Sequence, residues 1–226
     1  MMRPLFCFLL LLAGATASLS AEEQTWSALT KQQKEQLLSG KQVVVEEDIP
    51  GKPWPRFTIY HLVKAKQSEV AAIFWDCELD PKYIPNCLSV RIVSQPSLWI
   101  NEGEYTLKMP LFLPDEVYVS RNELKKLSPN SYEISWKVIK SRYTESCSGS
   151  LRIEEHDGMT LLRYSNLVVP GSRIAGLLRS TAGTQVIASV HALVRQVNSE
   201  VERAPRLLEQ QLQALEHSLE SPKQAK

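Results

Sequence analysis

The chain has 226 residues, with 26 basic and 25 acidic side chains and a formal net charge of +1 at pH 7. This length suits one domain of ordinary size with short extensions, and it is enough to bury a substantial core. The balanced and scattered charge argues against a nucleic-acid groove and against a strongly acidic partner.

The first residues are typical of an export signal. Arg3 provides a positive start, Leu5 to Leu12 form an unbroken apolar run, and small residues follow, with cleavage expected after Ala17 or Ala21. The apolar run is shorter than the roughly 20 residues needed to cross a bilayer, which argues against an uncleaved anchor. We therefore divide the chain into a signal peptide, a folded domain and a C-terminal amphipathic helix with a polar tail, at residues 1–21, 22–204 and 205–226.

Three cysteines follow the signal: Cys77, Cys87 and Cys147. In an oxidising compartment an odd number permits one disulfide and one free thiol, and Cys77 and Cys87 are the favoured pair because they flank a short turn-rich segment. The alternative is that all three are buried thiols that pack as small apolar side chains. The chain has no Asn-x-Ser/Thr glycosylation site. We expect the mature protein to be periplasmic or secreted, with a bacterial periplasm as the simplest location.

A short helix and a hairpin are predicted first in the mature chain. Thr30 and Gln33 form a capping box for a helix that ends at Gly40. Val43 to Val45 and Phe57 to Val63 are β-rich runs separated by a turn with two prolines. These two runs predict a hairpin at the edge of a sheet.

Two short helices and a series of strands come next. Ser68 is expected to cap a helix that runs to about Asp76, and a further helical turn begins at Asp80-Pro81 and ends before Pro85. The alternating runs that follow are typical of half-buried antiparallel strands. They lie at about Val90 to Ser94, Glu104 to Met109, Val117 to Leu124, Tyr132 to Ile139, Gly149 to Glu154 and, after an Asp-Gly turn, Thr160 to Val169.

Two amphipathic helices are predicted at the C-terminal end. The first runs from about Ile174 to Val201, with apolar residues at steps of three and four that form a stripe wide enough to cover a sheet. The second follows Pro205 and carries leucines from Leu208 to Leu219 on one face. It either packs on the domain or serves as a docking or oligomerisation helix.

This order of elements resembles the START and polyketide cyclase-like superfamily. The resemblance covers roughly Val43 to Val201 and implies an α+β fold, in which a curved antiparallel β-sheet grips a long C-terminal α-helix, with short helices between the second and third strands. The segments that carry it are Ser68 to Asp76 with Tyr83-Ile84-Pro85-Asn86, Pro110-Leu111-Phe112, Val119-Ser120-Arg121-Asn122, and Tyr164 through Val169-Pro170-Gly171-Ser172 to Leu178.

Such a fold leaves a space between sheet and helix that favours an apolar ligand. We therefore expect an exported protein that binds or transfers a lipid, an isoprenoid or another hydrophobic small molecule. The candidate ligand-binding residues, for each of which plain core packing is the alternative, are Tyr105, Leu107, Met109, Val117, Val119, Arg121, Ile134, Trp136, Tyr164, Leu178, Ile187 and Val190.

Arg121 has two interpretations. Strand alternation places it on the face of Val117 and Val119, where a buried guanidinium needs a partner such as a ligand head group or a carboxylate. At the edge of the sheet, its long side chain would instead reach water.

Two other functions stay open. A cyclase or dehydratase would use the same cavity, with Arg121, His61 or Tyr164 polarising the ligand. A protein-interaction module would use the outer surface and the last helix. The sequence has no His-x-x-x-His, Cys-x-x-Cys or Gly-x-Ser-x-Gly spacing, so we expect no catalytic constellation, metal or cofactor. The expected partners are a hydrophobic ligand and, transiently, a membrane, with no nucleic acid and no prediction of oligomeric state.

Overall fold

A computed structural model describes residues 25–109, 113–171 and 179–220, with the side chains of the long C-terminal helix described from Gly183 onward. The predicted signal peptide, the predicted start of the long helix and the polar tail lie outside these residues. So do Pro110-Leu111-Phe112 and the candidate ligand-binding residue Leu178.

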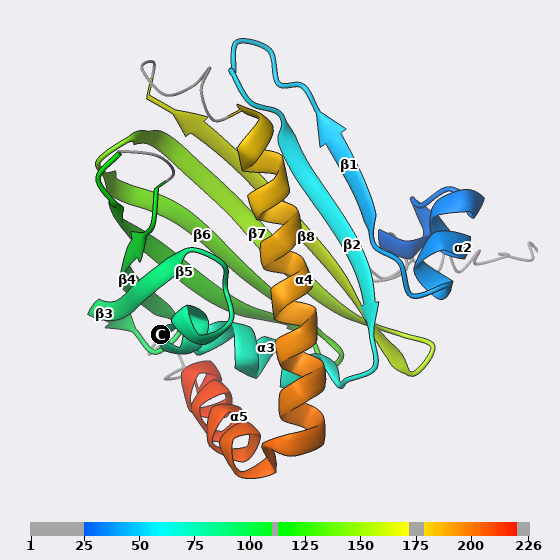
Figure 1. Ribbon diagram of the computed structural model, residues 1–226. Helices are drawn as coiled ribbons and strands as arrows, with labels where there is room; N and C mark the ends of the chain where they lie inside the picture. The colour runs from blue at the N-terminus through cyan, green and yellow to red at the C-terminus, as the bar shows by residue number, and fades with distance from the viewer. Residues whose placement is uncertain (1–24, 110–112, 172–178, 221–226) are drawn as a thin grey trace, which may run out of the picture.

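One antiparallel sheet of eight strands forms the framework (Figure 1). Its order is β1-β2-β8-β7-β6-β5-β4-β3, so the predicted N-terminal hairpin lies at one edge, beside the last strand. The strands are β1 (Val43–Glu47), β2 (Arg56–Val63), β3 (Cys87–Ser97), β4 (Ile100–Leu107), β5 (Glu116–Ser128), β6 (Ser131–Ser141), β7 (Thr144–His156) and β8 (Met159–Pro170).

The sheet is concave because its pairing slips at several points. The register of β5 on β6 shifts between Val119 and Ser120, and that of β7 on β8 shifts between Thr144 and Ser146. An extra residue on one strand bends it and increases its twist. As a result the sheet curves around α4 (Arg179–Arg203), which runs along its concave side (Figure 1). The predicted α+β class and the gripped C-terminal helix are confirmed.

The remaining helices are α2 (Lys31–Leu38), α3 (Gln67–Trp75), the 3₁₀ helix η1 (Cys77–Lys82) and α5 (Pro205–Leu219). The predicted capping box of α2 is present, because Thr30 Oγ1 accepts from Gln33 N at 3.2 Å and Gln33 Oε1 accepts from Thr30 N at 2.8 Å. Ser68 does not cap α3. The N-cap lies two residues earlier, at Lys66, whose N–H donates to Glu69 Oε2 at 2.7 Å.

The main core lies between the concave face of the sheet and helices α3, α4 and α5. The C-terminal half of α4 contributes Leu193 and Val197, which are at most 1% exposed. Gly183, at its other end, allows close approach to β2, because a Cβ atom there would lie 2.8 Å from the ring of Phe57. No helix among the described residues has the length and apolar character needed to span a membrane.

The last helix, α5, belongs to this core. Leu208 and Leu215 are buried, Gln211 Nε2 donates to Asp76 Oδ2 at 3.2 Å, and Ser218 Oγ accepts from Trp75 Nε1 at 3.0 Å. The apolar stripe of α5 is therefore covered by α3 of the same chain. Of the two predicted roles for this helix, packing on the domain is the one that the structure contains, and docking through this stripe would require α5 to leave α3.

We expect Leu215→Ala to lower the free energy of unfolding by about 2–4 kcal/mol, because it removes a buried side chain and leaves a cavity against α3. Leu219→Ala, on the same stripe but only partly buried, is the matched control and should cost less. Denaturant unfolding followed by tryptophan fluorescence measures both. Equal and small losses would show that α5 contributes little to the fold.

Candidate functional site

A cavity of about 320 Å³ lies between the concave face of the sheet and the N-terminal half of α4. This volume is within the range of small-molecule pockets, roughly 300–1,000 Å³. Aliphatic side chains from the sheet and from α4 form much of the wall, including Leu107, Ile134, Val138, Val168, Val186 and Val190. The site therefore has the apolar lining that a hydrophobic ligand requires.

An aromatic wall follows the middle of the sheet. The ring of Trp136 lies 5.0 Å from that of Tyr164 and 6.0 Å from that of Phe74, measured between centroids. Gly149 on β7 is opposite Trp136, and a Cβ atom there would lie 2.4 Å from the indole ring. Glycine thus allows the indole to pack against β7, where its Nε1 donates to Asn166 Oδ1 at 3.1 Å.

Several residues predicted to bind a ligand lie on this cavity wall. They are Tyr105, Leu107, Met109, Ile134, Trp136, Tyr164 and Val190. Their place on the wall follows from strand alternation and, for Val190, from the apolar stripe of α4. Contact with a ligand stays a prediction for each of them.

The prediction of which face of β5 points into the cavity was wrong. Val117, Val119 and Arg121 lie on the opposite face of the strand, and Tyr118, Ser120 and Asn122 line the cavity instead. The apolar valines suggested the buried side, but β5 turns polar residues inward where it borders the cavity.

Three other residues also lie away from the predicted site. Arg121 is exposed and its Nη1 lies 3.1 Å from Glu102 Oε1, so it reaches the surface, as in the second of its two interpretations. Ile187 is absent from the wall, because α4 turns its neighbours Val186 and Val190 toward the cavity. His61 also lies elsewhere, between β2 and α4, with its ring 6.4 Å from that of His191.

Polar side chains on the inner face of β4 and β5 form hydrogen bonds with one another. Ser120 Oγ donates to Asn122 Oδ1 at 3.0 Å, and Asn122 Nδ2 donates to Asn101 Oδ1 at 2.8 Å and to the Tyr105 hydroxyl at 3.5 Å. The rings of Tyr105 and Tyr118 stack, with centroids 5.0 Å apart and an interplanar angle of 1°. Buried polar groups require such partners.

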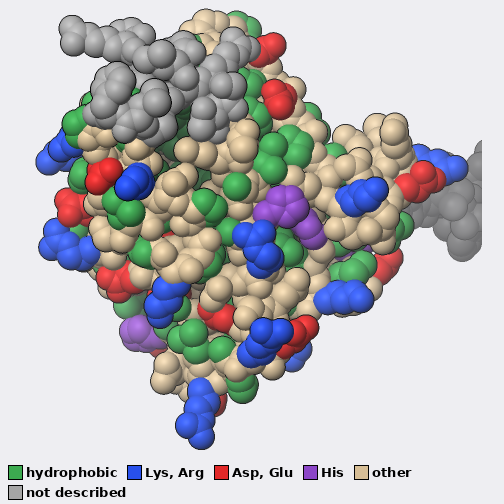
Figure 2. All heavy atoms as spheres, in the orientation of Figure 1, with side chains coloured by type: hydrophobic (Ala, Val, Ile, Leu, Met, Phe, Trp, Pro, Cys, Tyr) green, Lys and Arg blue, Asp and Glu red, His purple; other side chains and the backbone are tan. Residues whose placement is uncertain are grey.

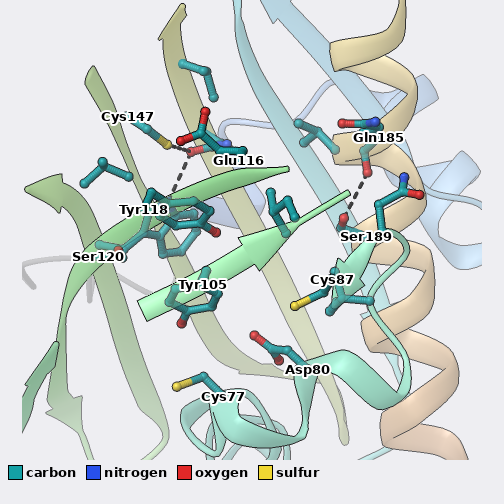
Figure 3. A pocket seen from close by; sticks show the side chains of 18 of the residues that line it. Cys77, Asp80, Cys87, Tyr105, Glu116, Tyr118, Ser120, Cys147, Gln185 and Ser189 are labelled. Atoms are coloured by element: carbon teal, nitrogen blue, oxygen red, sulfur yellow. Dashed lines mark hydrogen bonds between the residues drawn. The ribbon is translucent and has the colours of Figure 1, made fainter. Parts of the chain in front are cut away.

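An acidic side chain, Asp80, enters the cavity from η1. Figure 3 shows its carboxyl group between Cys77 and Cys87, pointing toward Tyr105. The Tyr83 hydroxyl donates to Asp80 Oδ1 at 2.8 Å. Burial raises the pKa of Asp80 to about 7, against the opposing effect of the Tyr83 hydrogen bond, and the charge of Asp76 raises it further. The sequence pattern does not indicate Asp80 as a site residue, because Asp80-Pro81 predicts only the start of a helix.

The other charged groups on the described wall are Glu116 and Lys108. The carboxylate of Glu116 accepts from Ser141 Oγ at 2.9 Å, and from the backbone N–H groups of Arg142 at 2.9 Å and Tyr143 at 3.0 Å. It therefore holds the turn between β6 and β7. Lys108 is exposed at the rim.

The predicted disulfide between Cys77 and Cys87 is absent from the described residues. Both, like Cys147, are free cysteines. Cys77 and Cys87 are buried, as the second alternative predicted, whereas Cys147 is only partly buried. All three line the cavity from separate elements, and burial of Cys77, which raises the pKa of its thiol, outweighs the nearby Tyr105 hydroxyl, which lowers that pKa. Burial raises the pKa of each thiol to about 12, so the thiols are protonated at neutral pH and are weak nucleophiles.

No group of three or more side chains that could hold a metal ion occurs among the described residues. On the face shown in Figure 2, side chains of both charges are scattered over α4 and its surroundings. That face carries no patch of one charge.

No family model and no curated protein matches the sequence. Solved structures do share its fold. A STAR-related lipid transfer protein from Xanthomonas axonopodis superposes with a TM-score of 0.63 at 13% identity, over 70% of this chain and 93% of its own. The Zhui aromatase/cyclase from Streptomyces sp. R1128 gives 0.56 at 16% identity, over 66% and 96%. Human STARD10 gives 0.56 at 11% identity, over 75% and 78%.

The chain therefore has the START-like helix-grip fold that the order of its elements indicated. Proteins with this fold include lipid transfer proteins and aromatase/cyclases. Identities this low establish the fold alone, and enzymatic activity stays open.

Asp80 should make the fold less stable as the pH rises. Its pKa is about 7 in the folded protein against an ordinary value of 3.8, so between these values the folded state keeps a proton that the unfolded state releases, and stability falls with pH. Asp80→Asn removes this effect. We expect it to raise the free energy of unfolding by about 1–3 kcal/mol at pH 8 and by much less at pH 4.

The measurement is denaturant unfolding at both pH values. The matched control is Glu78→Gln, which neutralises an exposed acid of the same 3₁₀ helix and should show little difference between them. A gain for Asp80→Asn that is equal at pH 4 and pH 8 would mean that Asp80 is not protonated in the folded protein near neutral pH.

Proposed function

We propose that this protein is an exported carrier that binds a lipid or another hydrophobic small molecule between the sheet and α4. The observation that carries the proposal is the cavity of about 320 Å³ with its aliphatic and aromatic wall. Transfer of apolar ligand surface from water into such a wall contributes roughly 25 cal/mol per Å². A carrier of this kind loads and releases its ligand at membranes, so it makes transient membrane contact.

The fold supports this proposal. The solved structures that share it include a lipid transfer protein from Xanthomonas axonopodis. Tyr105, Leu107, Ile134, Trp136, Tyr164 and Val190 lie on the wall, and in the proposal they contact the apolar part of the ligand.

The protein purified from cells should carry a ligand that denaturing extraction and mass spectrometry detect. Val138→Trp, which fills the cavity from β6, should reduce the recovered ligand at least about tenfold, since it removes the volume that the ligand occupies. Ile139→Trp is the matched control, because Ile139 is the next residue of the same strand and is 51% exposed; it should retain the ligand. If the wild type yields no ligand and binds no uncharged hydrophobic dye, the carrier function is wrong.

Export is the second part of the proposal, supported by Arg3 and the apolar run Leu5 to Leu12. Residues 1–30 fused to an alkaline phosphatase without its own signal should give phosphatase activity in bacteria, because that enzyme needs the disulfides that form outside the cytoplasm. Leu9→Arg, which interrupts the apolar run, should abolish the activity. Equal activity from both fusions, or activity from neither, would argue against export.

A second candidate is a cyclase or dehydratase that uses the same cavity. It is favoured by Asp80, a cavity-facing acid with a pKa near neutral, as a general acid requires. Of the residues predicted to polarise a ligand, only Tyr164 lies on the wall, because Arg121 and His61 are elsewhere. The carrier stays the first choice because the described wall offers this acid without an assigned base.

A further inference from the structure

The two oxygens of Asp80 have different surroundings. Oδ1 accepts a hydrogen bond from the Tyr83 hydroxyl at 2.8 Å. Among the described residues no hydrogen bond reaches Oδ2, although the carboxyl group points into the cavity (Figure 3). One oxygen of this acid is therefore held by the protein, and the other is available to a ligand.

The hydrogen bond at Oδ1 leaves Oδ2 to carry the proton of the neutral acid. With the Tyr83 hydroxyl donating to Oδ1, the arrangement that uses both oxygens places the proton on Oδ2, where it is a hydrogen-bond donor directed at the cavity. The nearby amide and hydroxyl groups of β4 and β5 are hydrogen-bonded to one another. The Tyr105 hydroxyl accepts from Asn122, and Asn122 also forms hydrogen bonds with Asn101 and Ser120. Asp80 Oδ2 thus offers the cavity an acidic donor that no described side chain engages.

We propose that Asp80 determines ligand specificity, and that its protonated carboxyl group donates a hydrogen bond to the carbonyl oxygen of an uncharged ligand, of the ketone or ester class. This inference rests on the proposed carrier function and assigns the polar end of its ligand. The apolar remainder lies along the wall formed by Phe74, Ile134 and Trp136.

The charge of the site supports an uncharged ligand. The positive side chain on the described wall is Lys108, which is exposed at the rim. A carboxylate or phosphate beside Asp80 would be buried against an acid with no cation to pair with it, which is unfavourable. A carbonyl oxygen needs only the one donor that the acid supplies.

The titratable groups around Asp80 come from several elements. The phenols and thiols are Cys77 from η1, Tyr83 at the end of η1, Cys87 from β3, Tyr105 from β4, Tyr118 from β5 and Tyr164 from β8, and the acid Asp76 precedes η1. From α4, Glu200 faces Tyr83. Burial raises the pKa of the phenols and thiols above their ordinary alkaline values, so they stay neutral. Asp80, with a pKa of about 7, loses its proton as the pH rises through neutral.

The test uses three ten-carbon probes that differ in their polar end: decan-2-one, decanoate and decylamine. Each displaces an uncharged dye, N-phenyl-1-naphthylamine, from the purified full chain at pH 6 and at pH 8.5. If only the protonated acid binds the ketone, the affinity for decan-2-one should fall about thirtyfold between these pH values. Decanoate should bind at least tenfold more weakly than decan-2-one at pH 6.

Asp80→Asn places a permanent N–H donor at the same position. It should bind decan-2-one at both pH values, with a pH effect below about twofold. Glu78→Gln, on the exposed side of η1, should keep the pH effect of the wild type. Dye binding by Asp80→Asn shows that the variant is folded with its cavity intact.

The outcomes separate this inference from the function on which it rests. If the dye binds neither protein, the carrier function fails and this inference fails with it. If the dye binds but decan-2-one shows the same pH dependence in Asp80→Asn as in the wild type, only the role of Asp80 is overturned. Decylamine bound tenfold more tightly than decan-2-one at pH 8.5, and lost in Asp80→Asn, would also overturn it, because Asp80 would then recognise a cation.

Discussion

One helix has to cover the concave face of an eight-stranded sheet, and the cavity is the result of that constraint. Helices α3 and α5 pack beside the C-terminal half of α4 and help it to cover the sheet. There Leu193, Val197 and Leu215 fill the core. Among the described residues the N-terminal half has no such neighbours in the core cluster, and its residues Val186 and Val190 border the cavity. Curvature prevents short side chains of sheet and helix from meeting there, so the same helix closes a core at one end and a binding space at the other.

That division determines where polar groups are placed. At the cavity end, β4 and β5 turn amide, hydroxyl and phenol groups inward, and these groups bond to one another through Asn101, Asn122 and Tyr105. Such a network contributes no net charge and leaves few unsatisfied groups, so it borders an apolar ligand at little cost. Asp80 differs from this network, because one of its oxygens is left to the cavity.

The fold could be predicted from the sequence because its signals are local and periodic. The capping box at Thr30, the strand alternation and the stripe of α4 each indicated the element that the structure contains. The site was predicted only in part, because alternation separates the two faces of a strand without showing which one turns inward. On β5 the apolar face of Val117 and Val119 suggested the wrong side, since a cavity permits polar residues where a core would exclude them. Asp80 lies on a 3₁₀ helix, where no strand or helix period indicates the direction of a side chain.

A ligand that binds only the protonated form of Asp80 is linked to the proton itself. Binding of either one favours binding of the other by the same factor, because the coupling free energy is reciprocal. With a pKa of about 7 for the free protein, ligand uptake at neutral pH draws in a fraction of a proton, and a rise in pH favours release. The proposed location outside the cytoplasm gives this linkage a consequence, since a protein there experiences the external pH directly. Burial of Asp80 destabilises the fold above the ordinary pKa of the acid, and the same burial makes ligand binding depend on pH.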